Sequence, residues 1–202
     1  MVENSVILTS MFSKISNQNH ILQYDNLLST EDSTNIKNWF LKKGDIKKAT
    51  DRVGYYYNDY QRELSIPDTL KPMIAAIDTL GMEYTKRNPE LNTLANKCIM
   101  PAVRFKWWKP GDAYSSWHCE HSHKFNNRVL GFMIYLSDNN SATEFYRYGK
   151  SRATIGRAIM FPAGFTHTHR GTPCKDQKDR YALSGYYFIT EELNENTDLT
   201  LS

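Results

Sequence analysis

Three of the chain's six histidines, a cysteine and a glutamate lie within six residues, in the segment HCEHSH that begins at His118. If this segment is a strand or a strand end, its side chains alternate between two faces, so that His118 and Glu120 point the same way. Residues two apart on a strand lie roughly 7 Å apart at the backbone, and their side chains can converge on one metal ion. A third ligand has to come from elsewhere, and the candidates downstream are His167 and His169 in the segment PAGFTHTHRG.

Two histidines and one carboxylate hold a metal on one side and leave positions open for an oxidant and a co-substrate, which is the ligand set of non-haem Fe(II) oxygenases. By itself a His-x-Glu pair is a weak signal, because histidines beside glutamates are common on protein surfaces. The second histidine cluster, about 50 residues downstream, strengthens it. Arg128 and Trp117 flank the segment and are candidates for substrate contact.

Arg180 opens an apolar, aromatic segment, RYALSGYYFI. A buried cation is costly unless an anion pairs with it. Arg180 is therefore either an arginine at a strand end with its head in water, or a guanidinium that binds a carboxylate of a ligand. Ser184 falls on the same strand face and offers a hydroxyl.

The elements that must position these residues change in kind near residue 100. Before it, a helix is expected after Ser29, with Asp32 completing a box-like cap and Gly44 as the stop, and a second helix follows from the apolar spacing of residues 70–80. After it, short β-rich segments alternate with turn signals. The strands are expected at 102–109, 115–121, 128–137, 142–148, 156–162 and 180–189, while the aromatic segment 52–64 is either a strand or irregular.

Helices followed by at least six strands predict a mainly β fold, a sandwich or barrel braced by N-terminal helices. The length of 202 residues suits one domain, and 13% aromatic residues agree with a β-rich fold. A net charge of +3 is too small to indicate nucleic-acid binding. Three scattered cysteines, no leader and no membrane-length apolar run favour a cytoplasmic protein without a membrane partner.

The second half of the chain resembles the Fe(II)- and 2-oxoglutarate-dependent dioxygenases, and among them the prolyl 4-hydroxylase-like branch in the short forms of phages and bacteria. The motifs of that family follow in its own order over about residues 100–190. They are HCE from His118, YLSD from Tyr135, SATEF ending at Phe145, GRAIMFP from Gly156, THTHRGTP, and RYALSGYYF from Arg180. The departures are Glu120 in place of the commoner Asp, the lack of paired glycines before Phe145, an Arg180 one residue further on, and Tyr186 where tryptophan is common.

The resemblance implies that His118, Glu120 and a distal histidine bind iron. His169 is the choice for the distal ligand, because HRGTP has the family's His-x-x-x-Pro spacing. His167 is the rival, since GRAIMFPAGFTH also fits a cupin pattern, Gly-x5-Pro-x-Gly-x2-His. The resemblance further assigns the binding of 2-oxoglutarate to Arg180, Tyr135, Ser184 and Tyr114, with Arg180 on the far carboxylate.

The fold implied by the resemblance is a double-stranded β-helix, or jelly roll, over residues 101–190, with 1–100 as a supporting part and 191–202 as a tail of one domain. The implied activity uses Fe(II), 2-oxoglutarate, O2 and ascorbate to hydroxylate a C–H bond, giving succinate and CO2. The implied substrate is a prolyl residue of a peptide or protein, in the host cytoplasm if the chain comes from a phage. Three alternatives are a free amino-acid hydroxylase, a cupin-type metal enzyme of non-oxidative chemistry, and a binding module without catalysis.

Overall fold

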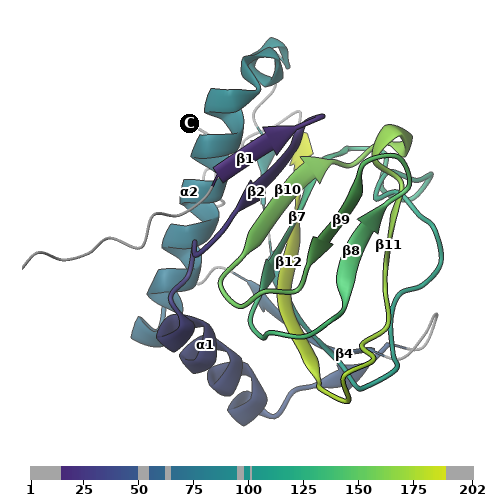
Figure 1. The fold of residues 1–202 in the computed structure, drawn as a ribbon. Helices are drawn as coiled ribbons and strands as arrows, with labels where there is room; N and C mark the ends of the chain where they lie inside the picture. The colour runs from purple at the N-terminus through teal and green to yellow at the C-terminus, as the bar shows by residue number, and fades with distance from the viewer. Residues whose placement is uncertain (1–14, 50–54, 62–64, 95–97, 101, 190–202) are drawn as a thin grey trace, which may run out of the picture.

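In the computed structural model, residues 15–49, 55–61, 65–94, 98–100 and 102–189 are described (Figure 1). The expected tail, 191–202, lies outside these residues. The helices are α1 (Thr30–Lys43) and α2 (Lys71–Arg87), with short 3-10 turns at Asp68–Leu70, Pro89–Thr93 and Phe165–His167. The strands are β1 (Ile15–Gln18), β2 (Ile21–Tyr24), β3 (Lys47–Lys48), β4 (Tyr55–Gln61), β5 (Cys98–Ile99), β6 (Ala102–Trp108), β7 (Arg128–Tyr135), β8 (Ala142–Phe145), β9 (Gly149–Arg152), β10 (Ala158–Pro162), β11 (His169–Gly171) and β12 (Arg180–Ile189).

Both predicted helices form, and the ends of α1 are where its capping residues put them. The Ser29 hydroxyl accepts a hydrogen bond from the Asp32 amide at 2.9 Å, and Gly44 ends α1 with a φ of 82°, a left-handed conformation that glycine adopts at little cost. In α2 the predicted apolar positions are buried. No helix in the described part of the chain has the length and apolar character needed to cross a membrane.

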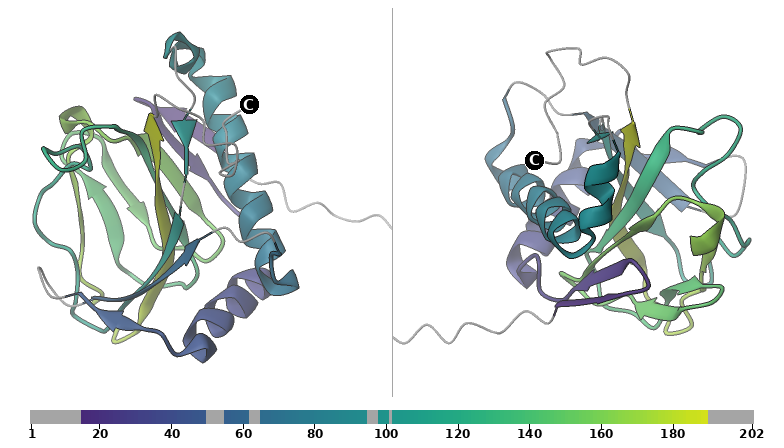
Figure 2. Two further views of the ribbon diagram at one scale, coloured as in Figure 1. Left: turned by 180° about the vertical axis from the view of Figure 1, so that it is seen from behind. Right: turned by 90° about the horizontal axis from the view of Figure 1, so that it is seen from above.

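The strands of the described residues form two antiparallel sheets that face each other. The large sheet has the order β1-β2-β10-β7-β12-β6-β4-β3, with β5 attached to β12, and the small sheet has the order β11-β8-β9. Two facing antiparallel sheets reached by crossovers between non-neighbouring strands agree with the expected jelly roll. The helices α1 and α2 cover the face of the large sheet that is turned away from the small one (Figure 1, Figure 2).

The large sheet keeps its two faces chemically distinct. On the helix side lie apolar side chains of alternate residues, such as Val103 and Phe105 of β6, which join the main core. Phe105 stacks on Phe40 of α1 with ring centroids 4.9 Å apart. The intervening residues of β6, which include Lys106 and Trp108, face the small sheet and line a cavity. Strand alternation therefore divides the sheet between a packing face and a cavity face.

The segment HCEHSH is not the strand that alternation suggested. Within it His118 makes an isolated β-bridge to His169 and Ser122 makes one to Phe125, and the residues around these bridges form a loop. The amides of Glu120 and His121 both donate to the carbonyl of Ala163, at 3.0 Å each, so the backbone turns instead of continuing a ladder. Sequence reasoning also missed the β1–β2 hairpin, whose two-residue turn, Asn19 and His20, has positive φ angles.

Candidate functional site

Two imidazoles and one carboxylate converge where the loop that contains His118 meets β11. The Nε2 atom of His169 lies 3.3 Å from Oε1 of Glu120, and the Nε2 atom of His118 lies 3.6 Å from the same oxygen. The candidate ligand atoms of these three residues are all within 4.8 Å of one another. The structure thus brings together the three residues that the sequence nominated as metal ligands, and their roles remain a proposal.

Backbone pairing holds the two histidines beside each other. The His118 amide donates to the His169 carbonyl at 3.0 Å, and the His169 amide donates to the His118 carbonyl at 2.8 Å. Each Nδ1 lies 2.9 Å from a backbone carbonyl, that of Ser116 for His118 and that of His167 for His169. When Nδ1 donates to such a carbonyl, the lone pair of Nε2 is left for a metal, as is common among metal-binding histidines.

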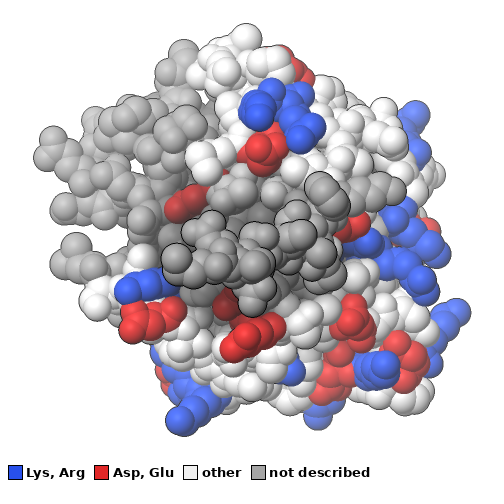
Figure 3. All heavy atoms as spheres, turned by 60° about the vertical axis from the view of Figure 1, so that its left-hand side comes forward, with Lys and Arg blue, Asp and Glu red and all other residues white. Residues whose placement is uncertain are grey.

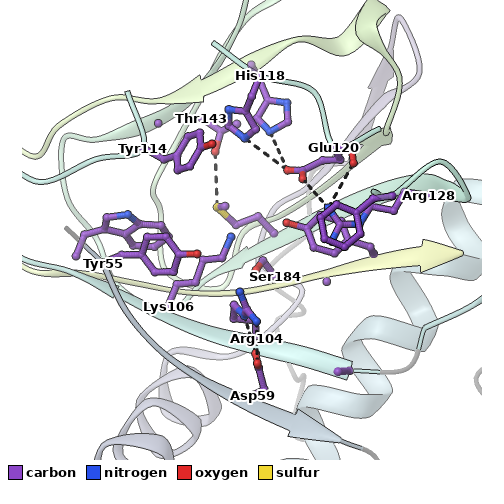
Figure 4. A pocket seen from close by; sticks show the side chains of 18 of the residues that line it. Tyr55, Asp59, Arg104, Lys106, Tyr114, His118, Glu120, Arg128, Thr143 and Ser184 are labelled. Carbon is purple, nitrogen blue, oxygen red and sulfur yellow. Dashed lines mark hydrogen bonds and ion pairs between the residues drawn. The ribbon is translucent and has the colours of Figure 1, made fainter. Parts of the chain in front are cut away.

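Glu120 is held by its second oxygen. Arg128 donates from Nη1 to Oε2 at 3.4 Å and to the Glu120 carbonyl at 3.3 Å, so that Oε1 faces the histidines (Figure 4). Burial acts to raise the pKa of the Glu120 carboxyl, but interactions with His118 and His169 outweigh it and hold the pKa well below the ordinary value. Glu120 is therefore an anion at neutral pH, the form that a divalent metal binds. Arg128, which the sequence offered as a candidate for substrate contact, pairs with Glu120 and also lines the cavity.

His167 and His169 are only two residues apart but have separate environments. The ring of His167 hydrogen-bonds at Nε2 to the carbonyl of Asn19, 2.8 Å away, and at Nδ1 to the hydroxyl of Thr166. His167 is absent from the group of candidate ligands found among the described residues. The structure therefore favours His169 over the cupin-type alternative in which His167 is the third ligand.

Arg180 is buried in the cavity wall with 2% of its surface exposed. Its guanidinium lies over the Trp108 ring at 3.9 Å and donates from Nη1 to the Ser141 hydroxyl at 3.2 Å. Its Nε has no partner, and no carboxylate of a described residue pairs with it. Burial lowers the pKa of Arg180 to about 10, which leaves it charged at neutral pH. The site thus contains a buried cation that lacks an anion.

The three other predicted 2-oxoglutarate contacts differ in position. Ser184 lines the cavity with a buried hydroxyl that has no partner, and Tyr114 lines it with its ring 4.2 Å from that of His118. Tyr135 is fully buried behind the wall, and its hydroxyl donates to Thr143, whose side chain does line the cavity. Ser184 and Tyr114 are placed to touch a ligand in the cavity. Tyr135 does not reach the cavity, but it holds Thr143, which does. Trp117 lies outside this cavity and stacks against Arg170.

The cavity has a volume of about 460 Å³, enough for a small dicarboxylate and part of a further molecule. Sequence reasoning missed two of its basic residues, Arg104 and Lys106, although both belong to one face of a predicted strand. Their positions could have been predicted from the spacing, because side chains two apart on a strand point to the same face, and Arg104 and Lys106 are spaced in this way from Trp108, which also lines the cavity.

The residues present fit a ferrous ion and a dicarboxylate. Ligands at about 2.1 Å on adjacent corners of an octahedron lie roughly 3 Å apart, close to the 3.3 Å and 3.6 Å that separate Oε1 of Glu120 from the two Nε2 atoms. The unpartnered donors of Arg180 and Ser184 suit an anionic oxygen group in the same cavity.

The fold is that of the prolyl hydroxylases and other 2-oxoglutarate- and Fe(II)-dependent oxygenases, which confirms the resemblance at the level of the fold. A prolyl-4-hydroxylase from Pseudomonas putida has 15% sequence identity and a TM-score of 0.66 over 85% of this chain and 93% of its own. The viral collagen prolyl hydroxylase of Paramecium bursaria Chlorella virus-1, solved as a 2-oxoglutarate complex, has 17% identity and a TM-score of 0.61 over 85% and 97%.

A third similar structure is a prolyl hydroxylase from Trichoplax adhaerens in complex with a peptide fragment of the hypoxia inducible factor oxygen degradation domain. It has 15% identity and a TM-score of 0.67 over 85% of this chain and 84% of its own. No protein-family model matches the sequence, and no curated protein matches it. The likeness therefore rests on the fold.

Proposed function

We propose that this protein is an Fe(II)- and 2-oxoglutarate-dependent dioxygenase that hydroxylates a C–H bond. One observation supports this most: two Nε2 atoms and one carboxylate oxygen converge in the cavity that also contains a buried arginine, and no carboxylate of the described residues pairs with that arginine. The triad suits the metal, and the arginine suits the far carboxylate of 2-oxoglutarate. Residues 101–190 form the catalytic core in this proposal, and residues 1–100 brace it.

In this proposal His118, Glu120 and His169 hold the iron. The Ser116 and His167 carbonyls keep the rings oriented, and Arg128 keeps Oε1 of Glu120 turned toward them. When bound, ferrous iron with 2-oxoglutarate and O2 supplies the oxidation, in which one oxygen atom enters the substrate C–H bond, the other enters succinate, and CO2 is released.

Arg180 fixes the far carboxylate of 2-oxoglutarate through charge-assisted hydrogen bonds in a site from which water is largely excluded. Ser184 donates its free hydroxyl to the same co-substrate, and Tyr114 packs beside the metal ligand His118. Tyr135 does not contact the co-substrate in this proposal but orients Thr143 through a hydrogen bond.

The substrate we propose is a prolyl residue. This rests on the shared fold with prolyl hydroxylases, one of which is described in complex with a peptide. The cavity opens to solvent, which allows part of a longer chain to enter it. Free proline is the variant of this substrate with the same reacting ring.

The test is release of succinate from 2-oxoglutarate by the protein with Fe(II) and ascorbate, together with direct calorimetric titration of Mn(II) as a redox-inert substitute. We expect His118→Ala to abolish both succinate release and metal binding. His123→Ala is the matched control, because His123 lies in the same segment but is exposed, and both measurements should be unchanged. An active His118→Ala protein would refute the proposal.

A cupin-type metal enzyme of non-oxidative chemistry would need neither 2-oxoglutarate nor Arg180. The position of His167 against Asn19 and the burial of Arg180 beside the triad both speak against it. Arg180→Met separates the two: a 2-oxoglutarate enzyme loses activity, whereas a cupin-type enzyme retains it.

A further inference from the structure

The cavity concentrates positive charge. Four basic side chains line it, and they are referred to below as the cavity cations: Arg104, Lys106, Arg128 and Arg180. Two carboxylates, Asp59 and Glu120, line it as well. On the outer face seen in Figure 3, in contrast, basic and acidic side chains of the described residues lie side by side. The cavity thus has an excess of cations that the face in Figure 3 does not show, in a protein whose net charge is only +3.

Two of the cavity cations are already compensated. Arg104 forms a bidentate pair with Asp59, with Nε to Oδ1 at 2.6 Å and Nη2 to Oδ2 at 2.8 Å (Figure 4). Arg128 pairs with Glu120. For Lys106 and Arg180 no ion pair with a described residue is present. Lys106 and Arg180 are therefore the cavity cations that leave a free charge for an anionic ligand to bind.

One of these two cations is accounted for by the proposed function, on which this inference rests. If Arg180 binds the far carboxylate of 2-oxoglutarate and the metal binds the other end, the dianion is fully used. Lys106 remains. It lies on β6 directly opposite Ala182 of β12, two residues along from the pair formed by Trp108 and Arg180. This separates its backbone from that of Arg180 by roughly 7 Å along the sheet.

Lys106 is placed to meet a second ligand. Its side chain points from the sheet into the cavity, toward the side on which His118 and Glu120 lie (Figure 4). The Lys106 ammonium lies 5.5 Å from the centre of the Tyr55 ring, and both residues line the cavity. A partly buried ammonium in a positive cavity is stabilised by an anionic ligand. A carboxylate replaces the hydrogen bonds to water that burial removed and supplies a negative charge.

We propose that Lys106 binds a carboxylate of the primary substrate, and that this enzyme therefore selects an anionic substrate over its neutral analogue. The carboxylate has two possible sources with the same chemistry. It is either the α-carboxylate of a free amino acid such as proline, or the acidic side chain of a residue next to the target in a peptide. In both cases Lys106 orients the substrate relative to the metal by fixing one end of it.

The test measures binding, not turnover. The protein, loaded with Mn(II) and the unreactive 2-oxoglutarate analogue N-oxalylglycine, is titrated by calorimetry and thermal shift with matched acid and amide probes. The free-amino-acid pair is L-proline and L-prolinamide. The peptide pair is acetyl-Pro-Glu-amide and acetyl-Pro-Gln-amide. The pair that shows the preference identifies the source of the carboxylate.

We expect the acid of one pair to bind about tenfold more tightly than its amide, since a single charge-assisted hydrogen bond separates them. The preference should disappear in Lys106→Met, which keeps most of the side-chain length without the charge, and persist in Lys106→Arg, which keeps the charge. The affinity for N-oxalylglycine should change less than about twofold in both variants.

The proposal is overturned if no acid binds more tightly than its amide to the wild-type protein, or if the preference survives Lys106→Met. It is also overturned if Lys106→Met weakens N-oxalylglycine and leaves the preference intact, because Lys106 then serves the co-substrate. Failure of the proposed function gives a different result, the absence of 2-oxoglutarate-dependent succinate release from the wild-type protein. The two failures are thus read from separate measurements.

Discussion

Replacing Arg180 by methionine should make the ligand-free protein more stable and, in the same variant, abolish its affinity for 2-oxoglutarate. The guanidinium is 2% exposed and has no carboxylate partner among the described residues. Such a charge destabilises the fold until a ligand compensates it. Methionine fills a similar volume without a charge.

The magnitude follows from the contacts of Arg180. Burial lowers its pKa from an ordinary 12.5 to about 10, which corresponds to roughly 3 kcal/mol against the charged form. Against this stand the hydrogen bond to Ser141 and the stacking on Trp108, each worth about 1 kcal/mol, and a long hydrogen bond of 3.5 Å to the Thr172 carbonyl, worth about 0.5 kcal/mol. The variant should therefore gain roughly 1 kcal/mol in unfolding free energy, or a rise of about 2–4 °C in the melting temperature of a chain of this size.

The assay is thermal unfolding without ligand, and again with Mn(II) and 2-oxoglutarate. The wild-type protein should be stabilised by the co-substrate and the variant should not, since binding to the folded state alone raises stability. Arg152→Met, at an exposed arginine of β9, is the control and should change the unfolding free energy by less than about 0.5 kcal/mol. A ligand-free Arg180→Met protein that melts below the wild type refutes the reasoning, because the guanidinium is then compensated within the fold itself.

Three further outcomes are expected. Gly185→Ala places a methyl group 2.5 Å from a neighbouring aromatic ring and should cost about 1–3 kcal/mol in urea unfolding, whereas Gly164→Ala, with open space around it, should be neutral. Lys106→Met should stabilise the ligand-free protein at pH 7 but not at pH 11. Burial lowers the pKa of this lysine from 10.5 to about 8. Between pH 8 and pH 10.5 the lysine is therefore more protonated in the unfolded chain than in the folded protein, and its contribution to the stability of the wild type rises with pH. In Mn(II) titrations, His169→Ala should remove metal binding, which His167→Ala should preserve; the reverse pattern would contradict the ligand assignment.

The helices and the central strands could be predicted because their signals are local. Ser29 and Gly44 mark the ends of α1 through their own backbone chemistry. The segment from Arg180 was recognised as a strand from its aromatic and apolar residues. The β1–β2 hairpin was missed, because its turn, Asn19-His20, requires positive φ at a histidine and lacks the glycine that usually signals such a turn.

The sequence predicted which residues meet in the candidate site better than it predicted how the backbone brings them together. The premise that placed His118 and Glu120 together, a continuous strand, was wrong. A bridge to His169 and two amides on one carbonyl bring them together instead. Such contacts join residues that are 51 positions apart for His118 and His169 and 43 apart for Glu120 and Ala163, and nothing local in the sequence encodes them. The same holds for Arg128, whose partner Glu120 depends on how the loop turns.

The division of the large sheet into a packing face and a cavity face has a consequence for which amino-acid changes this sequence can accept in evolution. In β12, Leu183 and Tyr187 help to form the core against the helices, while Arg180 and Ser184, set at the alternate positions of the same ten residues, face the cavity. A mutation at Arg180 or Ser184 changes the lining of the cavity, whereas one at Leu183 or Tyr187 changes the packing of the core. New substrate preferences can therefore arise along one strand without loss of structural integrity.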